Sequence, residues 1–305
     1  MSIGSIILNF FSPILEFLAP IVPGEIFPYF FTMELFQRAL IASLLVTFVA
    51  GFLGRFLMIR NLSLIGDGLA HVSFGGIAVG IVLGSAGPLW FALAFSIVAA
   101  VSIYEMQTRE ILTGDAAIAI FLTGMLALGL VVLRIWGGGI QADIEGYLFG
   151  NLLLIDEESF DIICFISIIA LFLLTVLKSA LLVTSVDPLA ARVQGIPVRP
   201  LGLIFSIITA SVVVSMVQVV GTLLVTALLV TPAATAHLVG TSFRSTLMWT
   251  QFFGFISVIL GLYFSAELET GSGSMIALIA ALIFVLVATI QQFVRKVISP
   301  GDNVN

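Results

Sequence analysis

Long apolar runs repeat along almost the whole chain, and polar residues gather in the short breaks between them. Each run is close to or above the roughly 20 residues that an α-helix needs to cross a bilayer. The pattern predicts nine spanning helices, over residues 37–58, 61–83, 88–105, 115–135, 159–183, 200–219, 221–239, 246–266 and 274–294. Glycine-rich clusters at 84–88, 136–139 and 270–273 separate several of them. We therefore expect an all-α, polytopic membrane protein.

The first 31 residues are apolar too, but Pro13, Glu16, Pro20 and Pro23 interrupt them. This favours an interfacial or re-entrant segment over residues 1–34, with a tenth span as the alternative. Residues 35–297 would then form the transmembrane domain, and residues 298–305 a short cytoplasmic tail.

The amino-acid composition agrees with a membrane protein and argues against several other classes of protein. Of 305 residues, 60% are hydrophobic and only 9% are charged, whereas a soluble domain carries about 25% charged residues. The net charge of −6 and the lack of a basic run give no indication of nucleic-acid binding. The single cysteine, Cys164, cannot form a disulfide framework or a thiolate metal cluster. The sequence contains no Walker A motif, so ATP hydrolysis by this chain is not expected.

Positive charge sets the expected orientation, because cytoplasmic loops of membrane proteins are rich in Lys and Arg. Nine alternating spans put most of these residues on one side: Arg55, Arg60, Arg109, Lys178, Arg192, Arg199, Arg244, Arg295 and Lys296. Only Arg38 and Arg134 fall on the other side. This predicts a cytoplasmic C-terminus and an external N-terminus. The same arrangement gives an acidic outer face, which would concentrate cations there.

Two ionisable residues stand out within the second span, in the stretch SLIGDGLAHVSFGG. Asp67 and His71 are four positions apart, so they share one face of a helix. An ionisable group at bilayer depth costs roughly 2.5–3.5 kcal/mol, and it therefore faces protein or a water-filled path. One interpretation is that the two side chains satisfy each other and lock the packing. The other is that they bind a divalent transition metal such as Zn²⁺ or Mn²⁺. Two ligands alone leave such a site incomplete.

Residues 186–200 form the most polar loop on the predicted cytoplasmic side. Asp187 is a suitable N-cap, Pro188 suits the first helical turn, and Gly195 is suited to end a short helix. Such a helix would either bind a separate ATP-hydrolysing subunit or simply connect two spans.

The span over 221–239 contains Pro232 and four threonines, whose hydroxyls are able to satisfy backbone groups that the proline frees. Broken helices of this kind often line transport pathways. His237, near the inner end of this span, is expected to be structural.

Taken in order, these segments resemble the membrane permease of the ABC-3 family of metal importers, from about Leu35 to Val294. The markers are RNLSLIGDGLAHVSFGGIAVG, GDAAIAIFLTGMLALGL, IEGYLFGNLL, DPLAARVQGIPVR, VGTLLVTALLVTPAATA and GLYFSAELETGSG. The resemblance implies the fold of a type II ABC importer-like permease in a prokaryotic plasma membrane. It also implies a dimer of permeases, most simply a homodimer, with two cytoplasmic ATP-binding subunits and an extracellular or periplasmic metal-binding protein.

The resemblance carries roles to individual residues. Asp67 and His71 match the family's metal-binding acid and histidine. The ATPase-coupling helix corresponds to Asp187, Pro188, Ala190, Arg192, Gly195 and Arg199. Glu269 stands where the family commonly has Asp, which makes it a candidate acid at the outer mouth, and no role transfers to His237. The metal would be transported rather than permanently bound. The residues around Asp67 look closer to zinc permeases, with manganese or iron as the alternative.

Two other classes use similar features. A proton-coupled secondary transporter would also need a buried Asp–His pair and a broken helix. An intramembrane metalloenzyme would need a third protein ligand and a general base, and the sequence has only two histidines.

Overall fold

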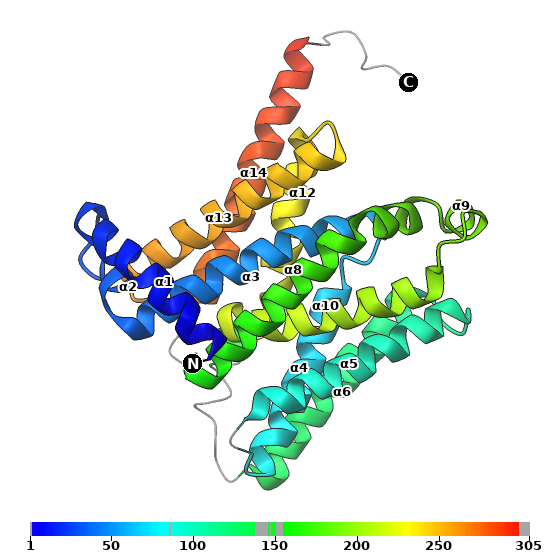
Figure 1. Cartoon of the computed structure of the whole chain (residues 1–305), viewed down its shortest axis with the longest axis horizontal. Helices are drawn as coiled ribbons and strands as arrows, with labels where there is room; N and C mark the ends of the chain where they lie inside the picture. Colours follow the sequence, from blue (N-terminus) through cyan, green and yellow to red (C-terminus); the bar gives the residue numbers. More distant parts are fainter. Residues whose placement is uncertain (1, 86, 138–145, 147, 151–154, 299–305) are drawn as a thin grey trace.

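The computed structural model describes residues 2–85, 87–137, 146, 148–150 and 155–298, with side chains up to residue 294. Within these residues the chain is helical throughout its regular structure (Figure 1). The expected C-terminal tail, apart from Ile298, lies outside the described residues, as does most of the marker segment 144–153.

The helices follow one another with short connections. The N-terminal segment contains α1 (Ile3–Leu18), the 3-10 helix η1 (Ala19–Ile21) and α2 (Tyr29–Thr32). The long helices of the first half are α3 (Glu34–Ile59), α4 (Ile65–Val82), α5 (Pro88–Thr108), α6 (Gly114–Trp136) and α8 (Glu157–Val186). The second half contains α9 (Pro188–Val193), α10 (Val198–Val220), α11 (Val225–Leu229), α12 (Thr231–Val239), α13 (Phe243–Glu267) and α14 (Ser272–Ile298).

Among the described residues, nine helices are long and apolar enough to cross a membrane, which confirms the predicted fold class. One member of the expected set differs. The predicted span 221–239 is two short helices, α11 and α12, joined at Val230. The ninth helix that meets the criteria is instead Ile3–Ile21, at the N-terminus. The other eight predicted spans correspond to long helices whose ends lie within a few residues of the expected ones.

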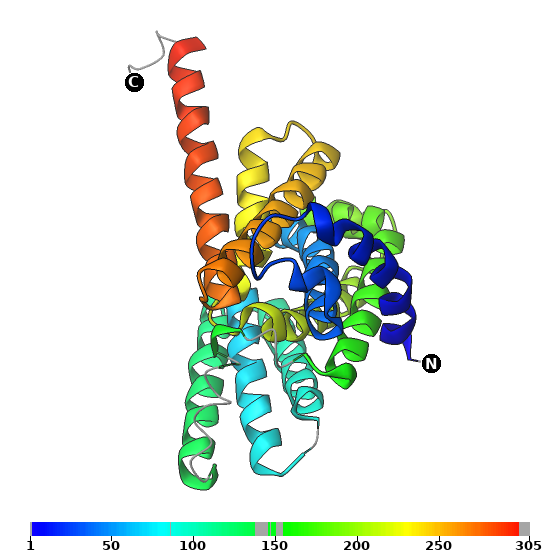
Figure 2. The same cartoon turned by 90° about the vertical axis from the view of Figure 1, so that its left-hand side faces the viewer.

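The long helices α3, α8, α10 and α13 run roughly alongside one another (Figure 1). The short helix α9 marks one end of this bundle, which we call the α9 end; the opposite end, where α3 and α8 begin, is the far end. Seen from the side, α14 extends away from the bundle in one direction, and α4, α5 and α6 extend in the other (Figure 2).

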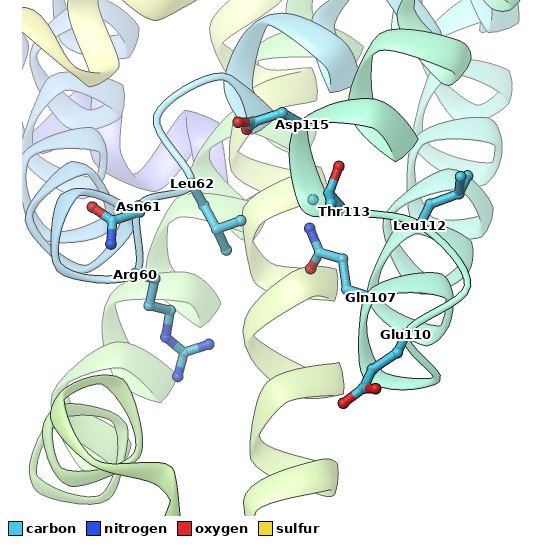
Figure 3. A pocket seen from close by; sticks show the side chains of 9 residues that line it. Arg60, Asn61, Leu62, Gln107, Glu110, Leu112, Thr113 and Asp115 are labelled. Atoms are coloured by element: carbon cyan, nitrogen blue, oxygen red, sulfur yellow. The ribbon is translucent and has the colours of Figure 1, made fainter.

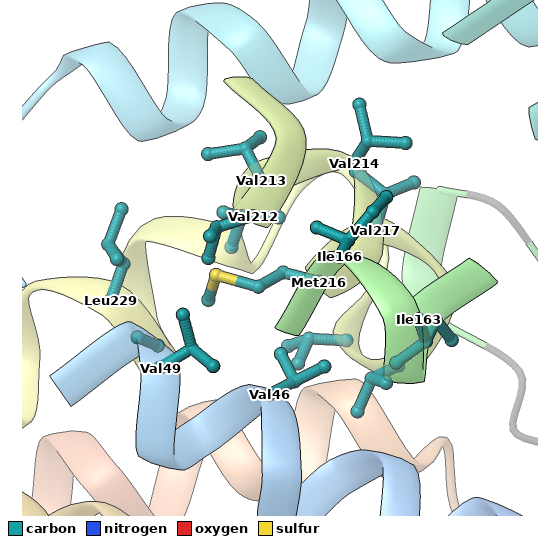
Figure 4. Packing of buried hydrophobic residues seen from close by; sticks show 14 of the residues in the cluster. Val46, Val49, Ile163, Ile166, Val212, Val213, Val214, Met216, Val217 and Leu229 are labelled. Atoms are coloured by element: carbon teal, nitrogen blue, oxygen red, sulfur yellow. The ribbon is translucent and has the colours of Figure 1, made fainter. Parts of the chain in front are cut away.

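The centre of the bundle is a continuous apolar core around α10. Val213, Val214, Met216 and Val217 are fully buried there. They pack among residues of α3, α8 and α11, including Val46, Ile163 and Leu229 (Figure 4). Because nearly every residue in the second half of α10 is buried, that half packs against the helices around it.

The N-terminal segment packs on the far end of the bundle. The backbone N–H of Gly4 donates to the carboxylate of Asp161 in the first turns of α8, at 2.7 Å. The hydroxyl of Ser12 donates to Gln37 near the start of α3, at 2.9 Å. Through these two hydrogen bonds, α1 packs across the first turns of α3 and α8.

Candidate metal site

Helix α4 carries the two ionisable residues, and its glycines let neighbouring helices approach closely. A Cβ atom at Gly75 would lie 2.8 Å from the carbonyl oxygen of Met125 on α6. A Cβ at Gly76 would lie 2.7 Å from the carbonyl oxygen of Phe91 on α5. Such spacing admits no side chain, so α4 is held tightly between α5 and α6.

The acid and the histidine lie together on α4, as their spacing predicts. His71 Nε2 lies 3.9 Å from Asp67 Oδ1, which is too long for a direct hydrogen bond. The imidazole is buried, whereas the Asp67 side chain is 33% exposed. The other ring nitrogen, Nδ1 of His71, is buried and has no partner among the described residues. The two side chains therefore lie at ion-pair distance, and Nδ1 of His71 is left without a partner among the described residues.

Asp67 and His71 do not form a complete site by themselves. Among the described residues, no group of three or more His, Cys, Asp or Glu side chains is close enough to hold a metal ion. Within the part of the chain that the structure describes, a third ligand would therefore come from a group other than a clustered His, Cys, Asp or Glu side chain.

The irregular segment between α10 and α12 contacts the first turn of α4, where a Cβ atom at Gly66 would lie 2.7 Å from the Leu229 side chain. Helix α10 ends at Gly221, whose φ of 85° falls in the left-handed region that favours glycine. A side chain at Gly221 would collide with the backbone of 148–150, and one at Gly273 would collide with Val220 and Phe149. Three distant parts of the chain therefore cross with their backbones in contact.

Two threonines in this segment differ from the expectation drawn from the sequence. Thr235 in α12 does satisfy a backbone group, since its hydroxyl donates to the carbonyl of Thr231 at 2.8 Å. The hydroxyls of Thr222 and Thr226 are buried without a partner among the described residues. Sequence reasoning grouped all four threonines together, and nothing in their local spacing distinguishes the free hydroxyls from the bonded one.

The loop before α10 contains the short helix that was predicted. The carboxylate of Asp187 caps it by accepting the backbone N–H groups of Leu189 and Ala190, at 3.0 and 2.9 Å. Pro188 occupies the first turn, and Gly195 follows the helix with φ 77°. Two apolar residues that the sequence did not single out are strongly exposed: Leu189 is 72% exposed and Val193 is 89% exposed. They give α9 an apolar outer surface.

The other predicted loop residues surround this helix. Ala190 and Arg192 lie within α9. Arg199 begins α10 and forms an ion pair with Glu105 of α5, with N–O distances of 2.8 and 2.9 Å. This pair ties the start of α10 to the end of α5.

Arg60 joins the end of α3 to the end of α8. Its guanidinium donates to Ser185 at 2.8 Å and to Thr184 at 3.2 Å, and it lies 4.2 Å from the ring centre of Phe205. Burial lowers the pKa of Arg60 to about 10, which still leaves it positively charged at neutral pH. Arg60 is seven positions before Asp67, and it contacts the residues just before α9. It therefore links the start of α4 to the α9 loop.

The remaining candidates lie apart from the pair. Glu269 is exposed in the turn between α13 and α14, with φ 52°. Its neighbour Glu267 accepts backbone N–H groups from Glu25, Ile26 and Phe27. His237 lies in the last turn of α12, with Nδ1 3.5 Å from Arg55. The structure does not bring Glu269 or His237 to Asp67.

A pocket of about 540 Å³ opens between the turn that precedes α4 and the turn that precedes α6 (Figure 3). Its polar lining includes Arg60, Asn61, Gln107, Glu110 and Asp115. Its charges are of both signs, so the lining alone does not define one ligand.

Comparison with known proteins places this architecture in a family. A model of the ABC 3 transport family matches residues 32–291. The manganese transport system membrane protein MntC of Listeria innocua is 34% identical over 248 residues, which are 81% of this chain and 88% of that protein. The manganese import system permease protein ScaB of Streptococcus gordonii is 32% identical over 263 residues, 85% of this chain and 94% of that protein.

A solved structure shows the same relationship. PsaBC from Streptococcus pneumoniae in complex with Fab contains a chain that superimposes with a TM-score of 0.73 at 33% identity, covering 83% of this chain and 90% of that one. The match covers nearly the whole transmembrane part, and the predicted resemblance is confirmed. The chain belongs to the ABC 3 transport family, whose members here are metal-ion permeases of ABC transporters.

Proposed function

We propose that this chain is the permease subunit of an ATP-driven importer for manganese. One observation carries this proposal. The relatives MntC and ScaB, which match more than four fifths of the chain, are named as manganese transport proteins. These relatives support manganese, the alternative drawn from the sequence, better than the zinc that the residues around Asp67 suggested. Membership of the ABC family also favours this function over a proton-coupled secondary transporter.

In this proposal the α9 end is cytoplasmic. The Lys and Arg residues at that end include Arg55, Arg60, Arg109, Lys178, Arg192, Arg199 and Arg244. The far end has Arg38, which pairs with Glu34 and Glu157, and an excess of acids. This distribution supports an external far end and a cytoplasmic C-terminus.

The N-terminal residues 1–34 would lie at the outer membrane interface rather than cross the bilayer. Two features of α1 support this interpretation. Its hydrogen bonds reach only the first turns of α3 and α8. Its exposed residues are mostly apolar and aromatic, including Ile6, Phe10, Ile14 and Phe17. Such a surface suits the boundary between headgroups and acyl chains.

Asp67 and His71 would hold the ion briefly on its way through the membrane. The carboxylate is the more accessible of the two, and the buried imidazole has a free nitrogen behind it. Carboxylate oxygen and imidazole nitrogen both coordinate divalent transition metals. An incomplete set of ligands binds weakly, which suits a site that must release its ion.

Helix α9 would dock on a separate ATPase. Its exposed Leu189 and Val193 offer an apolar contact, and Asp187 and Gly195 fix the two ends of the helix. Movement of α9 would reach α4 through Arg60, which contacts Thr184 and Ser185 immediately before the loop. An external metal-binding protein would deliver the ion, and two copies of the permease would form the complete path.

The test is transport by the complete system. The chain is reconstituted in proteoliposomes with its ATPase and binding protein, and ATP-dependent uptake of radioactive manganese is measured with and without excess zinc. We expect manganese uptake that requires ATP. Zinc uptake with no manganese uptake would contradict the choice of metal, and uptake that is independent of ATP would contradict the importer itself.

A further inference from the structure

The free hydroxyls of Thr222 and Thr226 are unusual for this protein. Many other buried Ser and Thr side chains in its helices donate to the carbonyl four residues earlier. Examples are Ser73 to Leu69, Thr209 to Phe205 and Thr250 to Thr246, at 2.8–3.0 Å. Thr222 is fully buried, and neither its hydroxyl nor that of Thr226 has a partner among the described residues. A buried hydroxyl without a partner costs about 1–3 kcal/mol, so these two groups call for a ligand.

Two contacts fix where this segment lies. At its start, the backbone N–H of Leu223 donates to the carbonyl of Leu148 at 3.1 Å. The Leu148 side chain packs with the cluster that contains Phe74 and Ala78 on α4. The segment therefore begins beside the part of α4 that lies on the far-end side of His71.

At its other end, the segment reaches the beginning of α4. A Cβ atom at Gly66 would lie 3.8 Å from the Thr226 hydroxyl and 2.7 Å from the Leu229 side chain. Gly66 is the residue before Asp67. The segment therefore contacts α4 near Phe74 through Leu148 and at Gly66 through Thr226, and these two levels lie on either side of Asp67 and His71 along the helix.

We propose that Thr226, with Thr222 as the next group toward the far end, supplies hydroxyl oxygen ligands to the ion held by Asp67 and His71. This inference rests on the proposed function, and it assigns ligands that the pair lacks. Neutral oxygen atoms suit manganese, which prefers carboxylate, carbonyl and water oxygens, whereas zinc gains more from nitrogen and sulfur. The threonines would thus shift a carboxylate–imidazole pair toward manganese and keep its affinity low enough for release.

The experiment measures Mn²⁺ binding to the purified full-length chain in lipid nanodiscs, by the loss of the free-ion electron paramagnetic resonance signal. Thr226→Val removes the hydroxyl and keeps the shape of the side chain, and Thr226→Ser keeps the hydroxyl. We expect the valine variant to bind Mn²⁺ about tenfold more weakly, and the serine variant to bind it nearly normally. The matched control is Thr235→Val, which removes a hydroxyl that is bonded within its own helix and should leave binding unchanged.

A third variant remains informative if Thr226→Val fails to fold. Thr226→Cys replaces a hard oxygen by a soft sulfur, so the ratio of Zn²⁺ to Mn²⁺ affinity should rise. Wild-type Mn²⁺ affinity in Thr226→Val, or an unchanged metal ratio in Thr226→Cys, would overturn the inference. Asp67→Ala separates this result from the proposed function: full Mn²⁺ binding by that variant would count against the metal site as a whole.

Discussion

The carboxylate of Glu267, at the end of α13, accepts the backbone N–H of Phe27 at 2.9 Å, across 240 positions of sequence. The same carboxylate accepts the N–H groups of Glu25 and Ile26, at 3.1 and 3.0 Å. Three consecutive N–H groups thus converge on one side chain, beside Gly24 with φ 116°. This arrangement attaches the N-terminal segment to the turn between α13 and α14.

Replacing Glu267 should free that segment. In Glu267→Ala the three N–H groups lose their acceptor, so hydrogen exchange at residues 25–27 should become faster while exchange in the core of α10 stays unchanged. Mass spectrometry of exchanged peptides gives the measurement, and Glu269→Ala, two positions later in the exposed turn, is the matched control. Unchanged protection at residues 25–27 in Glu267→Ala would show that other contacts hold the segment.

The metal-binding pair gives a second prediction. Asp67→Asn and His71→Ala should each reduce manganese uptake by about 100-fold or more, since each removes a ligand rather than a supporting group, whose loss typically costs about 10–100-fold. Association with the ATPase and thermal stability should remain near normal, because neither residue touches α9. The control is Glu16→Gln, an exposed acid in α1. Normal uptake combined with a large loss of stability would favour the packing interpretation.

Helix α9 gives a third prediction. Leu189→Asp or Val193→Asp places a charge on its exposed apolar surface, and Arg192→Glu reverses its charge. Each should weaken co-purification of the ATPase and separate ATP hydrolysis from transport. Gly195→Pro should act in the same way, because proline cannot adopt φ 77°. Leu189→Met is the conservative control. If all of these variants transport normally, the loop is a connector.

Much of this fold could be predicted from the sequence because its causes are local. Apolar runs gave eight long helices nearly to their ends, and Asp187, Pro188 and Gly195 gave the bounds of α9. Spacing alone put Asp67 and His71 on one face. The separation of α11 from α12 could not be predicted in the same way, since it depends on contacts with residues 148–150 and 273 far along the chain. The partners of Glu267 and Arg60 are equally non-local, and so is the difference between Thr226 and Thr235.

Close helix packing gives a fourth prediction, with a matched pair of glycines. A Cβ atom at Gly54 of α3 would collide with the backbone carbonyl of Leu229, whereas nothing lies within 4 Å of one at Gly124 of α6. Gly54→Ala should therefore destabilise the protein by about 1–3 kcal/mol. Gly124→Ala should be neutral or slightly stabilising, because alanine is the better helix former. Thermal unfolding in detergent compares the two, and equal stability would contradict the close approach of α3 and α11.

Arg60 gives the last prediction. Arg60→Lys keeps the charge but loses the planar group that contacts two hydroxyls and the ring of Phe205 at once. Stability should fall by about 1–2 kcal/mol, and ATP hydrolysis should drive less uptake per turnover. Arg109→Lys is the control, because that arginine is exposed and makes one surface ion pair. A stable Arg60→Lys transporter with normal coupling would remove Arg60 from the link between α9 and α4.

The crossing of three backbones at Gly150, Gly221 and Gly273 has a mechanical consequence. No side chains separate these three backbone segments. They are packed in direct contact, so one segment cannot shift without displacing the others. A displacement of the 148–150 loop must therefore be passed directly to the threonine-bearing segment and to the start of α14. We therefore expect these three parts of the chain to move together rather than independently.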